Sequence, residues 1–244
     1  MSTKRCWAQI LGGCSGGLSD EHPAGHHGDL LTDVTILGFH ADLENEVVPI
    51  DALKQKVLCQ DHNEQLGREV DPEGGRAYRA IVRWFDGKDG EQVAHGELWI
   101  PTVAEISGQL FGRWLCKYSC NMQAIRGAVP DVQYVRCAFG LEAACYYLRD
   151  PMGGPMQYRR RIRYENHLLQ YPDETAHRIV FRVLFMGLEF LVTPQPLEDI
   201  REFLVDQHRA AFDAEWKRPR EVTSFGEPGV PTAYLRFSWG EEPA

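Results

Sequence analysis

The chain has 244 residues, a net charge of −9, and a composition that is 43% hydrophobic and 25% charged. This balance is typical of a globular protein and excludes a largely disordered, collagen-like or coiled-coil chain. No apolar run approaches the ~18 residues of a membrane-spanning helix, and no signal-peptide pattern is visible at the start. We therefore expect a cytoplasmic protein with no membrane partner, whose seven cysteines serve in packing, metal binding or catalysis rather than in disulfides.

The acidic charge is concentrated at the N-terminal end. Residues 1–75 contain 5 Lys and Arg against 13 Asp and Glu, a net charge of −8. Residues 76–244 contain 21 against 22 and are close to neutral. The first segment also shows few stretches with helical periodicity. We therefore expect an N-terminal unit of residues 1–75 and a larger domain of residues 76–244.

The elements predicted for the first unit are short. Residues 33–39 and 46–58 have the composition of short strands joined by a turn. Residues 61–70 and 75–85 have apolar residues at helical spacing. The intervening Asp-Pro-Glu-Gly-Gly, residues 71–75, predicts a turn and a helix N-terminus between them.

The larger domain contains longer elements. The apolar spacing predicts long helices over 103–125 and 197–216, and a β-hairpin over 178–193 with its turn at Met-Gly. Three further segments have the composition of strands: 132–139, 158–164 and 232–239. The predicted fold class of this domain is therefore α+β, with an antiparallel sheet and two long helices.

Two groups of sulfur and imidazole donors lie in the first unit. Cys6 and Cys14 form one group, and Cys59 and His62 form the other. Structural zinc is held by a closed tetrahedron of Cys and His, and Cys59-x2-His62 has suitable spacing for one half of it. A zinc ion would also explain how a Gly-rich segment folds, since metal binding supplies folding free energy. The alternative is that the three cysteines are buried as small apolar residues.

The same segment resembles the HNH or His-Me finger nucleases, and in particular proteins like recombination endonuclease VII. The resemblance covers about residues 5–75. It is carried by the Cys…Cys pair, the Glu-His dipeptide at 21–22, and the Cys-x-x-His pair followed at once by Asn63. The wide Cys6–Cys14 spacing and His62 in place of a thiolate depart from the family pattern, and two further positions differ. Glu21 replaces the more usual Asp, and Lys54 stands where many members carry an Asn that orients the catalytic His.

The resemblance implies a zinc-bound ββα finger with a catalytic cation beside it. Cys6, Cys14, Cys59 and His62 would hold the structural zinc. Glu21 and Asn63 would hold Mg²⁺ or Mn²⁺, and His22 would act as general base in hydrolysis of a phosphodiester bond, most often in DNA. This chemistry is sound in outline. A neutral imidazole accepts a proton from water near neutral pH, and a hard cation on oxygen ligands stabilises charge on the phosphate.

A dense basic run lies in the larger domain, Tyr-Arg-Arg-Arg-Ile-Arg-Tyr at 158–164. In a strand Arg159, Arg161 and Arg163 would share one face and Arg160 the other. Together with Lys54 these side chains are the candidate contacts to a nucleic-acid backbone. The alternative for the run is a solvated strand face.

The sequence thus predicts a metal-dependent DNA endonuclease. The alternative is a catalytically inactive, zinc-stabilised module that binds nucleic acid or protein. In that case the Glu-His pair only supports the zinc site, and Asn63 is a helix N-cap. The four other cysteines, Cys116, Cys120, Cys137 and Cys145, are expected to pack in the core. The sequence leaves the oligomeric state open.

Overall fold

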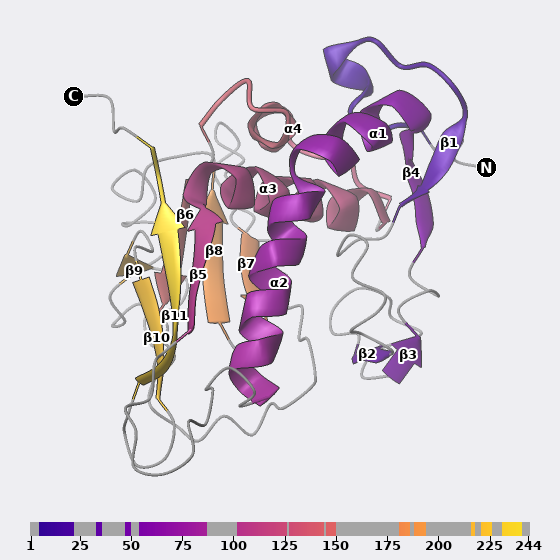
Figure 1. Cartoon of the computed structure of the whole chain (residues 1–244). Coiled ribbons are helices and arrows are strands. Elements are labelled where there is room, and N and C mark those ends of the chain that lie inside the picture. Colours follow the sequence, from indigo (N-terminus) through magenta and orange to yellow (C-terminus); the bar gives the residue numbers. More distant parts are fainter. Residues whose placement is uncertain are drawn as a thin grey trace, which may run out of the picture.

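A computed structural model describes twelve stretches of the chain (Figure 1). They are residues 5–21, 33–35, 47–49, 54–86, 102–125, 127–143, 145–149, 181–185, 188–193, 216–217, 221–225 and 231–240. Helices and strands are mixed along these stretches, which confirms the α+β class. Among the described residues, no helix combines the length and the apolar character needed to cross a membrane.

The described helices are one short 3-10 helix and four α-helices: η1 (Gln9–Leu11), α1 (Gln60–Glu69), α2 (Asp71–Asp86), α3 (Gly108–Ile125) and α4 (Val132–Ala138). The strands are β1 (Leu18–Glu21), β2 (Asp33–Thr35), β3 (Val47–Pro49), β4 (Gln55–Cys59), β5 (Thr102–Ser107), β6 (Cys145–Arg149), β7 (Phe181–Phe185), β8 (Leu188–Thr193), β9 (Trp216–Lys217), β10 (Glu221–Phe225) and β11 (Pro231–Ser238).

The described strands form four small sheets. Two are antiparallel pairs, β1–β4 and β2–β3. The third has the order β7-β8-β6-β9 with antiparallel neighbours. The fourth has the order β10-β11-β5, in which β11 is antiparallel to β10 but parallel to β5. The parallel pair, β5 and β11, joins two segments more than a hundred residues apart in the sequence. The last described strand therefore pairs with a strand near the start of the predicted larger domain.

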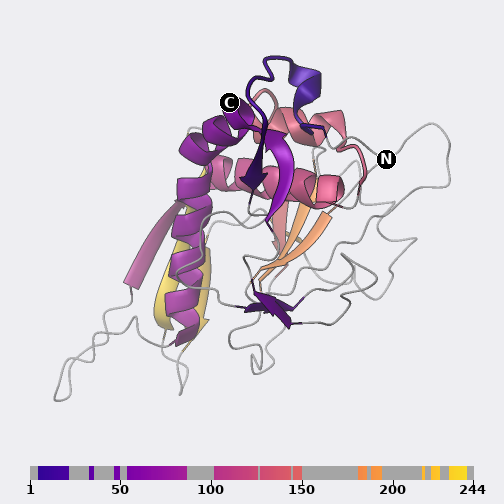
Figure 2. The same ribbon diagram turned by 90° about the vertical axis from the view of Figure 1, so that its right-hand side faces the viewer.

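Helix α3 is the centre of the described core. It packs against α2, α4, β4, β5, β8 and β11, and Figures 1 and 2 show it running between α4 and the strands. Every residue from 114 to 121 is buried, as expected for a helix covered on all sides. Phe111 stacks on Trp114 with ring centroids 5.6 Å apart, and Trp114 stacks on Tyr118 at 6.1 Å.

Charged side chains anchor the start of α2 to this core. Lys117 of α3 is 1% exposed, and its Nζ lies 2.8 and 2.7 Å from the two carboxylate oxygens of Asp71. The buried Glu73 accepts a hydrogen bond from the backbone N–H of Ser107 at the end of β5. Buried charges are tolerated when they are paired in this way.

The turn predicted at 71–75 is wrong, because α2 begins at Asp71 and only Val70 separates it from α1. Pro72 is accommodated there because the first helical turn does not need its N–H. Asp71 and Glu73 suit the same turn by complementing the helix dipole. Gly74 is required for a packing reason, since a Cβ there would lie 2.3 Å from Nε1 of Trp114.

Two other predicted elements change type. Residues 132–139, predicted as a strand, form helix α4, because Asp131 caps it by accepting a 2.7 Å hydrogen bond from the N–H of Gln133. The helix predicted over 103–125 begins only at Gly108. The residues before it form β5, whose Val and Ile suit a strand paired with β11.

The remaining predictions divide into confirmed and untested ones. The helices over 61–70 and 75–85, the hairpin over 178–193 and the strand over 232–239 are confirmed by α1, α2, β7–β8 and β11. Most of the helix predicted over 197–216 and all of the strand over 158–164 lie outside the described residues, although Trp216 belongs to β9. The boundary between 1–75 and 76–244 stays a prediction.

Candidate metal centre

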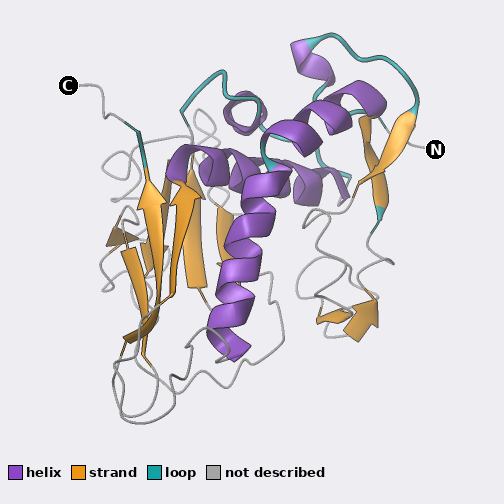
Figure 3. Cartoon of the chain, in the orientation of Figure 1, coloured by secondary structure: helices purple, strands orange, loops and turns teal. Residues whose placement is uncertain are grey.

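The framework of the site is an antiparallel strand pair followed directly by a helix. β1 pairs with β4, with Leu18 opposite Cys59, and α1 starts at the next residue, Gln60 (Figure 3). Cys59 therefore ends the strand and His62 lies in the first turn of the helix. This junction brings a thiol and an imidazole onto the same side of the chain.

The other two donors come from the segment before β1. Cys6 is held next to β4, because the N–H of Trp7 donates to the carbonyl of Val57 at 2.9 Å. The chain then makes the single turn η1 and reverses through Gly12 and Gly13, whose φ angles of 77° and 67° favour glycine. This reversal explains how Cys14 returns to the site despite the wide Cys6-x7-Cys14 spacing.

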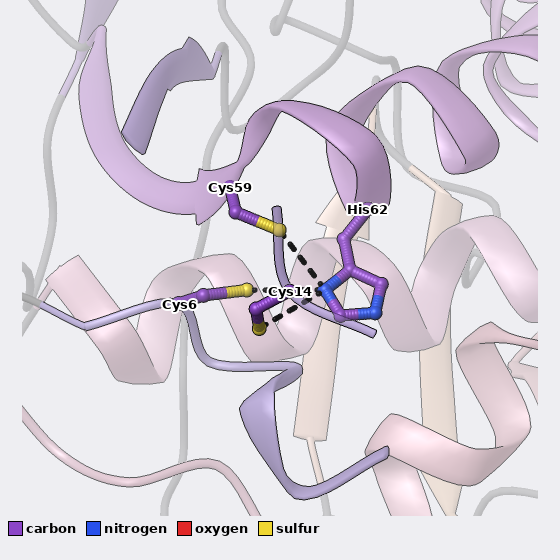
Figure 4. Close-up of side chains that lie close together, drawn as sticks. All are labelled: Cys6, Cys14, Cys59 and His62. Atoms are coloured by element: carbon purple, nitrogen blue, oxygen red, sulfur yellow. Dashed lines mark hydrogen bonds between the residues drawn. The ribbon is translucent and has the colours of Figure 1, made fainter. Parts of the chain in front are cut away.

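The four side chains converge (Figure 4). Nδ1 of His62 lies 3.3 Å from Sγ of Cys6, 3.6 Å from Sγ of Cys14 and 3.2 Å from Sγ of Cys59. All four donor atoms lie within 4.8 Å of one another. A tetrahedral zinc with bonds of about 2.3 Å to sulfur and 2.0–2.1 Å to nitrogen would hold sulfur and nitrogen about 3.5 Å apart. The observed spacing is that of a ligand set.

Hydrogen bonding alone does not account for this arrangement. One imidazole nitrogen carries either one proton or one lone pair in the ring plane, so it can serve one partner well but not three. The three cysteines are free rather than disulfide-bonded. A cation among the four atoms would satisfy all of them at once, and Cys6, Cys14, Cys59 and His62 could therefore hold a metal ion.

Two of the three thiols, those of Cys6 and Cys59, receive hydrogen bonds from the backbone. Burial raises the pKa of Cys6 to about 12, although hydrogen bonds from the backbone of Cys59 and Ala8 act to lower it. Burial also acts to raise the pKa of Cys59, but hydrogen bonds from the backbone of His62 and Ser15 and from the other thiols outweigh it, so this pKa is lowered. N–H groups directed at sulfur favour the thiolate, which is the form that binds a metal.

His62 is held in the form that a metal needs. Burial lowers its pKa, against the opposing effects of Asp61 and of a hydrogen bond to the backbone of Gly12. The imidazole is therefore neutral at neutral pH. Because Nδ1 faces the sulfurs, Nε2 is the nitrogen that donates to Gly12. Such an outer hydrogen bond fixes the tautomer and the ring orientation of a metal-binding histidine.

Side chains from the helical core back the centre. Phe139, directly after α4, contacts the ring of His62 edge-on with centroids 5.2 Å apart and that of Trp7 at 6.0 Å. Nε1 of Trp7 donates to Oδ1 of Asn121 on α3 at 2.8 Å, in a buried environment. The sequence reasoning missed these partners. Asn121 lies seven residues after Trp114 and therefore on the same face of α3. That position was the signal from which its place in the core could have been predicted.

Asn63 lies beside β1 rather than at the helix N-terminus. It is the fourth residue of α1, and the N-cap is Cys59, so the alternative role of Asn63 as N-cap is wrong. Its Nδ2 donates to Oγ of Ser19 at 3.0 Å and to the carbonyl of Asp20 at 3.2 Å. Glu21, which follows Asp20, is the last residue of β1 and lies opposite Gln55. The side chain of Glu21 and all of His22 lie outside the described residues.

The predicted nucleic-acid contacts are described only in part. Lys54 is exposed and immediately precedes β4. The four arginines at 159, 160, 161 and 163 lie outside the described residues. The cysteines of the larger domain behave as predicted where their side chains are described, since Cys116, Cys120 and Cys137 are fully buried.

No known protein family, curated protein or solved structure matches the chain. The geometry of the site is therefore the basis on which a function is assigned.

Proposed function

We propose that Cys6, Cys14, Cys59 and His62 bind a structural zinc ion. The convergence of three sulfurs on one imidazole nitrogen supports this, because soft thiolate and imidazole ligands in a tetrahedron are characteristic of zinc. Four protein ligands fill the coordination sphere of zinc, so we assign the ion a structural rather than a hydrolytic role. Natively purified protein should contain one zinc per chain by elemental analysis.

We further propose that the zinc-bound unit is a ββα finger of the HNH type, and that the protein is a metal-dependent endonuclease. The observation that carries this proposal is the contact of Asn63 with the carbonyl of Asp20. Asn63 directly follows His62, a proposed zinc ligand. The contact places Asn63 at the end of β1, where Glu21 and His22 follow in the sequence. The order of strand, strand and helix around the cysteines also agrees with such a finger.

In this proposal each residue has a separate task. A divalent cation, Mg²⁺ or Mn²⁺, would stabilise the negative charge that develops on the phosphate. Glu21 and Asn63 supply a carboxylate and an amide oxygen, which are hard ligands suited to it. His22 removes a proton from the attacking water. Lys54 is exposed and immediately precedes Gln55, the residue opposite Glu21. It is suited to contact the phosphate backbone, as are Arg159, Arg160, Arg161 and Arg163.

Nicking of supercoiled plasmid tests the proposal. Wild-type protein should nick DNA in Mg²⁺ or Mn²⁺ but not in EDTA, and His22→Ala should lose the activity by at least ~100-fold while retaining its zinc. His26→Ala removes a histidine that lies four residues later in the sequence and has no role in the proposal, and it is the matched control. Equal inactivity of wild type and His22→Ala on double-stranded, single-stranded and branched DNA would overturn the nuclease assignment but not the zinc site.

A second function is a zinc-stabilised binding module without catalysis. The net charge of −8 over residues 1–75 favours a partner other than nucleic acid for this unit. The amide of Asn63 would then only join α1 to β1. A protein that retains zinc, binds no second cation and captures a protein partner would support this function.

A further inference from the structure

The contact between Asn63 and β1 occurs at a β-bulge. Ser19 lies opposite Leu58, but Asp20 lies opposite Lys56, so Val57 is an extra residue in β4. A bulge interrupts the regular ladder and redirects the neighbouring chain, and bulges are frequent next to active sites. This one falls between Ser19 and Asp20 of β1, one residue before Glu21.

Backbone groups at the bulge bond outside the strand pair. The carbonyl of Val57 accepts from the N–H of Trp7 at 2.9 Å, which ties the Cys6 segment to β4. The carbonyl of Asp20 accepts from Nδ2 of Asn63 at 3.2 Å, which ties α1 to β1. The bulge is therefore the point at which both strands, the cysteine segment and the helix are joined.

Ser19 and the carbonyl of Asp20 both contact the NH₂ end of the Asn63 amide. The Ser19 hydroxyl donates to the carbonyl of Leu58 at 3.4 Å, so it presents lone pairs to Asn63 at 3.0 Å. The carbonyl of Asp20 only accepts. It therefore selects the NH₂ end of the amide, and the Ser19 hydroxyl adds a second contact to that same end. With the NH₂ end fixed on β1, the direction of Oδ1 is fixed as well.

We propose that Ser19 is a positioning residue that holds the Asn63 amide with its oxygen available to a divalent cation. This inference rests on the proposed nuclease function, in which Asn63 is a cation ligand. The zinc fixes the backbone of Asn63 through the adjacent His62, and Ser19 fixes the side chain. A cation prefers the amide oxygen to the nitrogen, so loss of the hydroxyl should weaken cation binding without removing a ligand.

The test compares Ser19→Ala with Ser19→Thr, which restores the hydroxyl. The matched control is Ser238→Ala, which removes a similar hydroxyl, one that donates to the carbonyl of Ile106 at 3.3 Å in another sheet. The first readout is the ¹⁵N-resolved exchange of the Asn63 side-chain amide protons, assigned with Asn63→Ala. Ser19→Ala should accelerate this exchange about fivefold, as expected for one lost hydrogen bond, while Ser19→Thr and Ser238→Ala should not.

The second readout is Mn²⁺ affinity by electron paramagnetic resonance, with zinc content measured on the same samples. Ser19→Ala should weaken Mn²⁺ binding about tenfold with zinc retained, and Ser19→Thr should restore it. Wild-type Mn²⁺ affinity in Ser19→Ala, combined with wild-type plasmid nicking, would overturn the positioning role and leave the nuclease function intact. A wild-type protein that binds no Mn²⁺ and cuts no DNA would overturn both proposals.

Discussion

The metal-centred unit, residues 5–21 and 54–69, and the helical core, α3 and α4, are stabilised by different means. None of residues 9–20 is buried, whereas every residue of 114–121 is. The core is held by apolar contact over large side chains such as Trp114 and Tyr118. The metal-centred unit buries little of its first segment, and the metal ion that we propose would supply the stabilisation that apolar burial does not.

The two regions nevertheless share one boundary. Trp7 and His62 belong to the metal-centred unit, and both contact Phe139 beside α4. Trp7 also bonds to Asn121 of α3. Loss of the metal should therefore affect the first region strongly and the second only at this face.

The largest expected effect comes from removing a zinc ligand. Cys59→Ser should abolish stoichiometric zinc binding and remove hydrogen-exchange protection from residues 5–21 and 54–69, because an apparent binding free energy of the order of 10 kcal/mol is lost. Protection in α3 should persist away from Trp7. Mass-spectrometric hydrogen exchange and elemental analysis measure both effects.

Cys116→Ala is the control for this change. It removes a fully buried thiol from the helical core and should cost about 1 kcal/mol in unfolding free energy without affecting zinc content. Full hydrogen-exchange protection of residues 5–21 and 54–69 after chelation, or in Cys59→Ser, would mean that the two regions do not differ in how they are stabilised.

Substitutions at two glycines should change the free energy of unfolding in opposite directions. Gly74→Ala should destabilise the protein by about 3 kcal/mol, because the new Cβ would lie 2.3 Å from Nε1 of the buried Trp114. Gly67→Ala in α1 meets only Asp71, at 3.8 Å, and should stabilise by about 0.5–1 kcal/mol through helix propensity. Urea denaturation measures both, and destabilisation of equal size would contradict the packing argument.

The boundary itself is tested by the Trp7–Asn121 hydrogen bond. Asn121→Ala leaves the indole N–H of Trp7 buried without its acceptor and should cost about 1–3 kcal/mol. Trp7→Phe removes the donor, so the double variant should be less destabilised than the sum of the two single ones. A coupling energy near zero in this cycle would mean that the regions are energetically independent.

The four proposed zinc ligands could be identified from the sequence because their residue types are rare and chemically specific. The path of the Cys6–Cys14 loop could not, since it depends on left-handed glycines that no spacing rule contains. The helices α1 and α2 followed from apolar periodicity. Residues 132–139 did not, because a short run with Val, Tyr and Val suits either strand or helix, and the cap at Asp131 decided it.

The contacts that support the site could not be predicted from the sequence either. Phe139 and Asn121 are ordinary core residues by pattern, and only the tertiary packing brings them to the metal centre. Ser19 became informative through a bulge, which shifts the register by one residue and leaves no compositional trace.

The smallest expected effect is a pH dependence that joins the two regions at the surface. A hydrogen bond from Arg113 of α3 is the main reason why the pKa of Glu69, at the end of α1, lies below its ordinary value of 4.5. A lowered folded-state pKa means that the carboxylate stabilises the protein above the unfolded pKa, and that this contribution is lost as the pH falls through the lowered one. Because Glu69 is 40% exposed, Glu69→Gln should cost less than about 1 kcal/mol at pH 7, and the difference should vanish in acid. Glu64→Gln removes the same charge from α1 at a carboxylate that bonds Gln60 and is the matched control. Equal pH profiles for the two variants would mean that the ion pair of Glu69 and Arg113 contributes nothing to the contact between α1 and α3.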